Sequence, residues 1–354
     1  MEYVYLGDSG LEVSRLGMGA IPFGTSMERD TYMQLADIFL DHGGNLIDTS
    51  NFYGGGMIGD HTNNAGKSER AVGEIIKGRR DRFVVATKGY WTMEEEIRPN
   101  GVGLSRAYLS KNIDESLKRL GTDYIDLYQC HNKDFYTPIE ETMRVFDDFI
   151  RAGKIRYIGV SNWDGWHVVK ANMYAREKGL TPFVSNQIWY NIADRVAEFS
   201  LIPACQDQGV ATIGWGVVAE GFVCGKYDRS MMNAPEGKRI FEVAKQGEMF
   251  SWERLATDRN WDTIDVIREI AEKHNRTMAN VAVRWILDAG FCEVALLGAS
   301  RVEQFENNME VMDFKLTDEE IRRLTETSEL PHPYPINFYD IFCRKDSEFY
   351  GGLR

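Results

Sequence analysis

Short apolar runs alternate along the chain with longer stretches in which apolar residues recur every three or four positions. The short runs are hydrophobic at nearly every position, which is typical of parallel strands that are buried on both faces. The longer stretches have the period of amphipathic helices, as in 105–120, where Leu109, Ile113 and Leu117 share one side. We expect strands at 14–19, 45–50, 83–90, 124–131, 155–162, 183–189, 211–216 and 293–300. We expect helices at 29–42, 67–78, 105–120, 138–151, 164–178, 196–208, 261–275 and 302–312.

Eight strands, each followed by a helix, predict a (β/α)8 barrel, the TIM-barrel fold. One such barrel takes about 250 residues, so we expect the chain to form one domain over residues 1–354. The alternative is a doubly wound open sheet, which normally carries a glycine-rich turn after its first strand. The run Gly17-Met18-Gly19-Ala20 matches that turn poorly, because Pro22 occupies the position of the third glycine.

Three segments lie outside the eight repeats. Residues 3–6 and 11–13 flank the turn Asp8-Ser9-Gly10, which predicts an N-terminal hairpin that closes the bottom of the barrel. Residues 314–330 have the pattern of an extra C-terminal helix, and 331–354, which begins with three prolines in five residues, is predicted to be an irregular tail.

Composition narrows the class of protein. Of the 354 residues, 43% are hydrophobic and 27% charged, which is typical of a globular chain. With 41 basic and 54 acidic residues the net charge is −13, so we expect no nucleic-acid partner. No apolar run approaches the ~20 residues of a membrane span, and the start Met1-Glu2-Tyr3-Val4-Tyr5 does not resemble a signal peptide. We therefore expect a cytoplasmic protein without membrane insertion. Whether the chain forms a homo-oligomer stays open.

The cysteines and histidines do not suggest a metal site. Five cysteines, an odd number, are widely spaced, and no Cys-x-x-Cys pair occurs. His61 lacks a second ligand at a suitable spacing, so we expect no bound metal.

Polar residues stand at the ends of three successive predicted strands: Asp48 with the nearby Tyr53, then Lys88, then His131. Taken singly, each has an ordinary structural explanation, such as a turn cap or a packed aromatic ring. Together they form a set of groups suited to acid catalysis. A lysine beside a tyrosine lowers the pKa of the phenol, so that the phenol can give up a proton near neutral pH. A carboxylate keeps the lysine charged and a histidine can orient a carbonyl oxygen, which suits reduction of an aldehyde or ketone by hydride.

In these motifs the sequence resembles the aldo-keto reductase superfamily over nearly its whole length. The resemblance implies a (β/α)8 barrel that uses NADPH/NADP to interconvert a small carbonyl compound and an alcohol. Asp48, Tyr53, Lys88 and His131 correspond to the catalytic tetrad of that family, with Tyr53 as general acid. An aromatic substrate pocket is expected from Phe52, Tyr53, Trp91, His131 and Trp163.

The same resemblance assigns cofactor contacts. Ser161, Asn162 and Gln187 match the positions that bind the nicotinamide amide, and Trp215 matches the residue that stacks on its ring. Ser300 and Arg301 match the 2′-phosphate site, and no acidic residue in 298–302 favours a free ribose hydroxyl, so we expect NADPH rather than NADH. The full expected set is Ala20, Ile21, Asp48, Ser161, Asn162, Gln187, Trp215, Gly216, Val217, Val218, Glu220, Gly221, Lys226, Arg239, Gly298, Ser300, Arg301, Gln304, Asn307 and Asn308.

Within the superfamily, Trp215 and Gly298-Ala299-Ser300 are similar to the branch of potassium channel β subunits and glyceraldehyde-phosphate-type reductases. A regulatory or redox-sensing subunit is therefore the alternative to an enzyme. His131 favours the enzyme, because the resemblance places asparagine there in channel subunits. Residues 55–66 form a long glycine-rich insertion after Tyr53, and we leave open whether it is a substrate lid or a surface loop.

Overall fold

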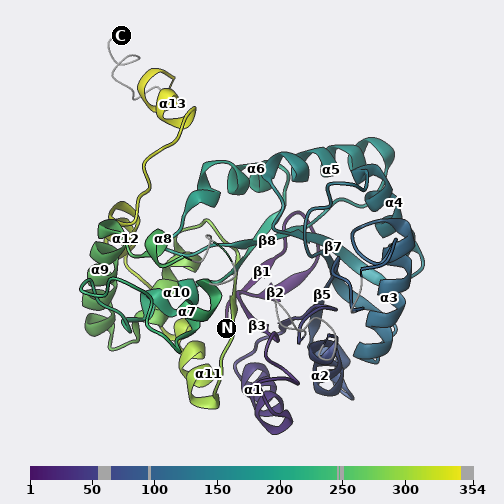
Figure 1. Ribbon diagram of the computed structural model, residues 1–354, viewed down its shortest axis with the longest axis horizontal. Helices are drawn as coiled ribbons and strands as arrows, with labels where there is room; N and C mark the ends of the chain where they lie inside the picture. Colours follow the sequence, from purple (N-terminus) through teal and green to yellow (C-terminus); the bar gives the residue numbers. More distant parts are fainter. Residues whose placement is uncertain (55–64, 95–96, 245–246, 248–250, 344–354) are drawn as a thin grey trace.

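The computed structural model describes residues 1–54, 65–94, 97–244, 247 and 251–343. Within them, eight parallel strands close into a barrel in which the first strand pairs with both the second and the last, as the sequence predicted (Figure 1). The barrel strands are β3 (Leu16–Gly19), β4 (Leu46–Asp48), β5 (Val84–Gly89), β6 (Ile125–Cys130), β7 (Ile155–Ser161), β8 (Ser185–Trp189), β9 (Ala211–Trp215) and β10 (Val294–Leu297).

Helices surround the barrel and connect its strands (Figure 1). The first six are α1 (Arg29–Asp41), α2 (Lys67–Ile76), α3 (Arg106–Leu120), α4 (Ile139–Arg151), α5 (Gly165–Lys178) and α6 (Leu201–Asp207). They are followed by α7 (Arg239–Ala244), α8 (Trp252–Leu255), α9 (Asp258–His274), α10 (Met278–Asp288), α11 (Val302–Met309), α12 (Asp318–Thr327) and α13 (Ile336–Phe342). Four 3-10 helices, η1 (Arg80–Arg82), η2 (Val196–Phe199), η3 (Ala219–Cys224) and η5 (Glu310–Asp313), complete the described elements. None of the helices in these ranges has the length and apolar character that a membrane span requires.

The N-terminal hairpin closes one end of the barrel, as predicted. Strands β1 (Tyr3–Tyr5) and β2 (Glu12–Ser14) pair antiparallel, and the backbone N–H of Asp8 donates to the carbonyl of Gly209 at 2.8 Å. Leu6, Leu11 and Val13 pack against side chains from inside the barrel. A Cβ at Gly7 would lie 2.2 Å from the carbonyl oxygen of Gly209, so only glycine lets the hairpin approach this closely.

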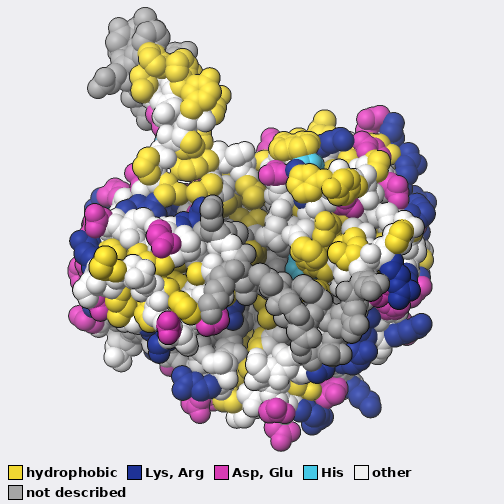
Figure 2. All heavy atoms as spheres, viewed as in Figure 1, with side chains coloured by type: hydrophobic (Ala, Val, Ile, Leu, Met, Phe, Trp, Pro, Cys, Tyr) yellow, Lys and Arg dark blue, Asp and Glu magenta, His cyan; other side chains and the backbone are white. Residues whose placement is uncertain are grey.

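Several local predictions are wrong. The predicted helix at 196–208 is two short helices, η2 and α6, with Ser200 between them in a non-helical conformation. The predicted irregular tail contains α13, which stands off the barrel beyond α12 (Figures 1 and 2). Helices α7, α8 and α10 were not expected. The prediction of one domain over 1–354 stays a prediction.

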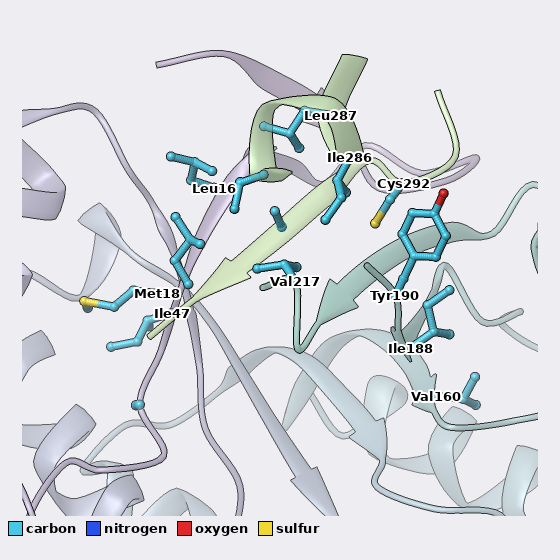
Figure 3. Close-up of a cluster of buried hydrophobic side chains, with 14 of the residues drawn as sticks. Leu16, Met18, Ile47, Val160, Ile188, Tyr190, Val217, Ile286, Leu287 and Cys292 are labelled. Carbon is cyan, nitrogen blue, oxygen red and sulfur yellow. The ribbon is translucent and has the colours of Figure 1, made fainter. Parts of the chain in front are cut away.

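The main hydrophobic core lies between the barrel strands and the surrounding helices. Figure 3 shows part of it, where Leu16 of β3 lies near Ile286 and Leu287 of α10, and Met18 lies beside Ile47 of β4. Valine, isoleucine and leucine on the outward faces of the strands pack against the helices in this layer. The strands are therefore apolar at nearly every position. Polar residues at the carboxyl ends of the same strands lie together at one end of the barrel, where a functional site can form.

Candidate active site

Lys88, near the end of β5, is the centre of the site. Its side chain is fully buried, with an exposed fraction of 0%. The Nζ ammonium donates to Asp48 Oδ2 at 2.6 Å and to the Tyr53 hydroxyl at 2.9 Å. It also donates to the carbonyl of Thr49 at 3.0 Å, so three acceptors surround its three protons.

Asp48, at the end of β4, is held from the opposite side by two amides. Its Oδ1 accepts from Gln187 Nε2 at 2.9 Å and from Gln129 Nε2 at 3.3 Å. Both carboxylate oxygens are therefore hydrogen-bonded, which is required of a buried charge. The charge of Asp48 and that of Lys88 compensate each other.

Charge and burial act in opposite directions on the pKa values of Lys88 and Tyr53. Burial lowers the pKa of Lys88, but nearby Asp48 and Tyr53 together raise it above its usual 10.5, so the ammonium is charged at neutral pH. Burial raises the pKa of Tyr53, and the lowering by Lys88 does not overcome it. The predicted net lowering of the Tyr53 pKa is therefore wrong. The phenol is neutral and carries its proton at pH 7.

His131 lies directly after β6 and faces the tyrosine. The two rings meet edge to face with centroids 5.5 Å apart. Burial, with a further contribution from the Lys88 charge, holds the pKa of His131 well below its usual 6.5, so the imidazole is neutral. Its Nδ1 lies 3.0 Å from the hydroxyl of Ser50, which fixes the ring orientation.

A second group of residues gathers at the ends of β7, β8 and β9. The indole of Trp215 packs edge-on against that of Trp189 at 5.0 Å, and its Nε1 donates to Asn162 Oδ1 at 3.1 Å. Trp189 Nε1 donates to Asp194 Oδ2, which also accepts from Arg254 of α8 at 2.7 Å. These contacts fix the plane of an indole that is partly exposed at the barrel mouth.

Gly216 is required for this packing. Its φ is +64°, a conformation that favours glycine, and a Cβ there would lie 2.1 Å from Trp189. The adjacent Val217 is buried in the core and Val218 is partly exposed. Any larger residue at 216 would displace the tryptophan pair.

The remaining positions expected to hold the cofactor lie along the same rim. Ser161 donates to the carbonyl of Gln187 at 3.0 Å, and the exposed Ile21 follows the buried Ala20 after β3. In η3 the backbone is kinked at Glu220 and Gly221, whose φ values are +55° and +90°. The carboxylate of Glu220 forms an ion pair with Arg239 of α7.

The α11 end of the rim is built around Gly298 and Gln304. Ser300 donates through its backbone N–H to Gln304 Oε1 at 3.0 Å, and Asn308 donates to the carbonyl of Gly298 at 3.3 Å. Asn307 instead faces α10, where it accepts from Thr277 and Asn280. Arg301 at the start of α11 and Lys226 after η3 are exposed.

These groups fit a nicotinamide dinucleotide. An oriented indole face, amide groups beside it, and exposed cations farther along the rim match a flat heterocycle joined to phosphates. Gly221 and Gly298 have open space where a Cβ would stand, so a ligand can approach the backbone closely at both points.

The predicted substrate pocket is only partly assembled. Phe52 packs on Trp91 with centroids 5.8 Å apart, beside Tyr53 and His131. Trp163 instead packs against Phe183 and His167, with centroids 5.5 and 6.0 Å away. Most of the long insertion at 55–66 lies outside the described residues.

Three contributors to the site were not predicted. Ser50 follows Asp48 by two residues and Gln129 precedes His131 by two, so the strand period of two could have placed both on the barrel-facing side. Asp194, which holds Trp189 and Arg254, has no comparable signal in the sequence. In the ranges that the structure describes, no group of three or more His, Cys, Asp or Glu side chains could hold a metal ion.

Comparison with known proteins gives one consistent answer. A model of the aldo/keto reductase family matches residues 15–329. The uncharacterized oxidoreductase YrpG of Bacillus subtilis is 36% identical over 331 residues, covering 92% of this chain and 95% of its own length. The norsolorinic acid reductase of Aspergillus flavus is 31% identical, covering 93% of this chain and 81% of its own. The aryl-alcohol dehydrogenase [NADP(+)] of Phanerodontia chrysosporium is 30% identical, covering 92% and 85%. The chain therefore belongs to the aldo/keto reductase family of oxidoreductases.

Proposed function

We propose that the protein reduces an aldehyde or ketone to an alcohol with NADPH, with Tyr53 as the general acid. The observation that carries the proposal is the contact of a buried, charge-compensated lysine with a tyrosine hydroxyl, 2.9 Å away, at the barrel mouth. Tyr53 and His131 are only partly buried, so a substrate at the mouth can reach both. The reaction is reversible, so the same groups serve alcohol oxidation.

Tyr53, Lys88 and Asp48 each have a separate role in transferring one proton to the substrate. When bound, the reduced nicotinamide supplies hydride to the carbonyl carbon. The neutral phenol of Tyr53 donates its proton to the carbonyl oxygen, and the Lys88 ammonium stabilises the phenolate that is left. Asp48 keeps Lys88 charged throughout.

His131 orients the carbonyl oxygen. If the Ser50 hydroxyl donates to Nδ1, the ring proton is on Nε2, which can then donate a hydrogen bond to the substrate. A neutral imidazole does this without competing with Tyr53 for the role of acid, and the lowered pKa of His131 keeps it neutral. Ser50 is in this scheme a positioning residue.

The preference for NADPH rests on charge. Arg301 and Lys226 are exposed cations at the rim, and a 2′-phosphate adds two negative charges that such cations can bind. A relative whose name specifies NADP(+) supports the same choice. Equal affinity for NADH, measured by quenching of tryptophan fluorescence, would refute it.

Aromatic carbonyl compounds are the substrates we propose to test first. Phe52, the residue before Tyr53, packs on the partly exposed ring of Trp91, and a planar aryl group packs well on such a surface. Two relatives carry names that refer to norsolorinic acid and to aryl alcohols. A panel of aryl and aliphatic aldehydes, followed by NADPH absorbance, would rank them.

The variant Tyr53→Phe tests the mechanism. It keeps the ring and removes the proton that is transferred, so kcat should fall by roughly 10²–10⁴-fold while NADPH affinity stays the same. Tyr90→Phe is the matched control, because Tyr90 directly follows β5 and packs on Trp91, and it makes no contact with Lys88 among the hydrogen bonds described above. Turnover of Tyr53→Phe equal to that of the control would rule out Tyr53 as the acid.

The alternative, a regulatory subunit similar to channel β subunits, predicts NADPH binding without turnover. The presence of His131 beside Tyr53 supports the enzyme. A full substrate panel without any NADPH oxidation would favour the alternative.

A further inference from the structure

Residues 331–343, which we call the C-terminal arm, project from the barrel. Figure 1 shows α13 beyond α12, well away from α4 and α5. The segment before α13 contains Pro331, Pro333 and Pro335, and alternating prolines make a chain extended and semi-rigid. The arm is therefore held away from the surface of its own barrel.

The arm is unusually apolar for a projecting segment. No residue of α13 is buried. Tyr334 is 81% exposed, and Phe338, Tyr339, Ile341 and Phe342 are between 40% and 55% exposed. Figure 2 shows these side chains as a continuous hydrophobic surface. A seven-residue helix is marginal in water without packing, so this surface is suited to a partner.

Contacts within the arm fix how the helix is presented. His332 Nδ1 lies 2.5 Å from Asp340 Oδ2, which ties the linker to α13. The ring of His332 packs edge-on against Phe199 of η2 at 5.6 Å, which ties the linker to the barrel. Phe338 and Phe342, one turn apart, have ring centroids 4.7 Å apart and form one apolar face.

A second exposed apolar surface lies beside α4 and α5, and we call it the aromatic cavity. It has a volume of about 290 Å³ and is lined by residues that include Lys133, Phe135, Trp163, Trp166 and His167. Phe135 is 77% exposed and Trp166 60% exposed, and the Lys133 ammonium lies near both rings. The Nε1 of the buried Trp163 has no hydrogen-bond partner among the residues that the structure describes. The cavity is thus an open aromatic site.

We infer that the C-terminal arm of one copy of this chain docks in the aromatic cavity of a second copy, and that the exchange is reciprocal. Each chain has both the C-terminal arm and the aromatic cavity. In a two-fold symmetric dimer each arm therefore occupies the cavity of the other copy, and both contacts are identical. The apolar face of α13 meets Phe135 and Trp166 of the partner. Because Lys133 follows His131 by two residues, the docked arm lies at the edge of the partner's active-site mouth.

The area is sufficient for a stable dimer. A full Phe or Tyr side chain buries about 200 Å², so the exposed parts of the arm's aromatic residues and Ile341 amount to roughly 500 Å². Complete burial of both arms, with an equal area on each of the two surfaces that receive them, sets an upper bound of roughly 2,000 Å², which reaches the range of specific protein interfaces.

Light scattering of the full chain tests the inference. The wild-type mass should be twice the 40.5 kDa of one chain. The arm variant Phe338→Ser/Phe342→Ser and the cavity variant Trp166→Ser should each halve that mass. Met232→Ser, which changes a residue that is 87% exposed outside both surfaces, should not. Far-UV circular dichroism and thermal melting verify that each variant is folded, which is expected because none of the four positions is in the core.

A mixing experiment separates this contact from a general loss of dimerisation. The arm variant keeps its cavity, and the cavity variant keeps its arm, so a mixture of the two should form a mixed dimer through one intact contact. A tag on one variant should then retain the other, with weaker affinity than in the wild type. Neither variant should be retained by a tagged copy of itself.

Three results would overturn the inference. A wild-type chain that stays at the single-chain mass over the whole concentration range excludes reciprocal docking. An arm variant that keeps the double mass shows that another surface holds the dimer. A single-chain wild type that sediments with lipid vesicles, while the arm variant does not, shows that the arm docks on a membrane instead.

Discussion

Replacing Asp48 by asparagine removes the charge that compensates the buried ammonium of Lys88. The side chains of the pair are 4% and 0% exposed, and Nζ to Oδ2 is 2.6 Å. In Asp48→Asn the ammonium keeps the carbonyl of Thr49 and the Tyr53 hydroxyl as acceptors, but neither is negatively charged at neutral pH. In the variant the buried ammonium of Lys88 is therefore hydrogen-bonded only to neutral groups.

Removing one partner of a buried ion pair costs about 3–5 kcal/mol, and we expect the lower end because an amide oxygen can still accept from Nζ. In a chain of this size, each kcal/mol lowers the melting temperature by about 2 °C, so Asp48→Asn should melt roughly 6 °C below the wild type. Lys88→Met should cost about as much, because it leaves the carboxylate of Asp48 buried without a cation.

The double variant Asp48→Asn/Lys88→Met distinguishes charge from packing. It removes both charges, so it should be more stable than either single variant and lie within about 1 kcal/mol of the wild type. Urea unfolding, followed by tryptophan fluorescence, gives the four free energies of unfolding. Catalytic activity should be lost in all three variants, so the stability result is independent of it.

The pH dependence follows from the direction of the pKa shift. In the wild type the pKa of Lys88 is raised above 10.5, so its contribution to stability is complete below pH 10.5 and is lost as the pH rises through the folded value. In Asp48→Asn, burial is the main remaining influence and lowers the pKa. Its destabilisation relative to the wild type should therefore shrink between about pH 7 and about pH 10. A double variant as unstable as the sum of the singles, or a destabilisation that grows with pH, would refute this reasoning.

Three further predictions follow from other parts of the structure. Gly216→Ala forces a Cβ to within 2.1 Å of Trp189 at a φ of +64°, and should lower the free energy of unfolding by about 2 kcal/mol or more. Gly221→Ala has a similar φ with no atom within 4 Å, so it isolates the backbone cost and should be milder in the same urea titration. Ser50→Ala removes the hydrogen-bond partner of His131 and should lower kcat about 10-fold with little change in NADPH affinity, whereas Ser50→Thr should restore most of the rate. Glu320 has a pKa lowered to about 2, to which its hydrogen bonds to Lys273 and Thr317 contribute, so its stabilisation is present above pH 4.5 and lost as the pH falls towards 2. Glu320→Gln should cost about 1–2 kcal/mol at neutral pH and flatten the acid limb of a thermal stability curve; an unchanged acid limb would contradict this.

The barrel was predictable because its signal is local. Each strand is a short apolar run that ends in polar residues, and each such run pairs with its neighbour in the predicted order. The grouping of Asp48, Lys88 and His131 followed from the same regularity, because parallel strands end at one face of a barrel. Tyr53, five residues after Asp48, follows on the same face.

Other features depend on contacts that spacing does not encode. Helix α10 is buried around most of its circumference, with Val281, Ala282 and Val283 all in the core, so no polar face marks its period. The seven residues of α13 are too few to display a helical repeat. The pKa of Tyr53 depends on the balance between burial and the Lys88 charge, which only the folded geometry determines.

The pairing of β3 with β10 has a consequence for biosynthesis. The first barrel strand, β3, has the last strand, β10, as its second neighbour. Arg15, directly before β3, donates a hydrogen bond to the carbonyl of Glu293, 278 residues later in the chain. At roughly 5–20 residues per second, a ribosome takes on the order of 15–55 s to synthesise that interval. Throughout this time the nascent chain exposes an unpaired strand edge, which is prone to aggregate. A chain released from the ribosome before Val294 lacks β10, the strand that closes the barrel. We therefore expect truncated translation products to depend on chaperones and to be degraded quickly.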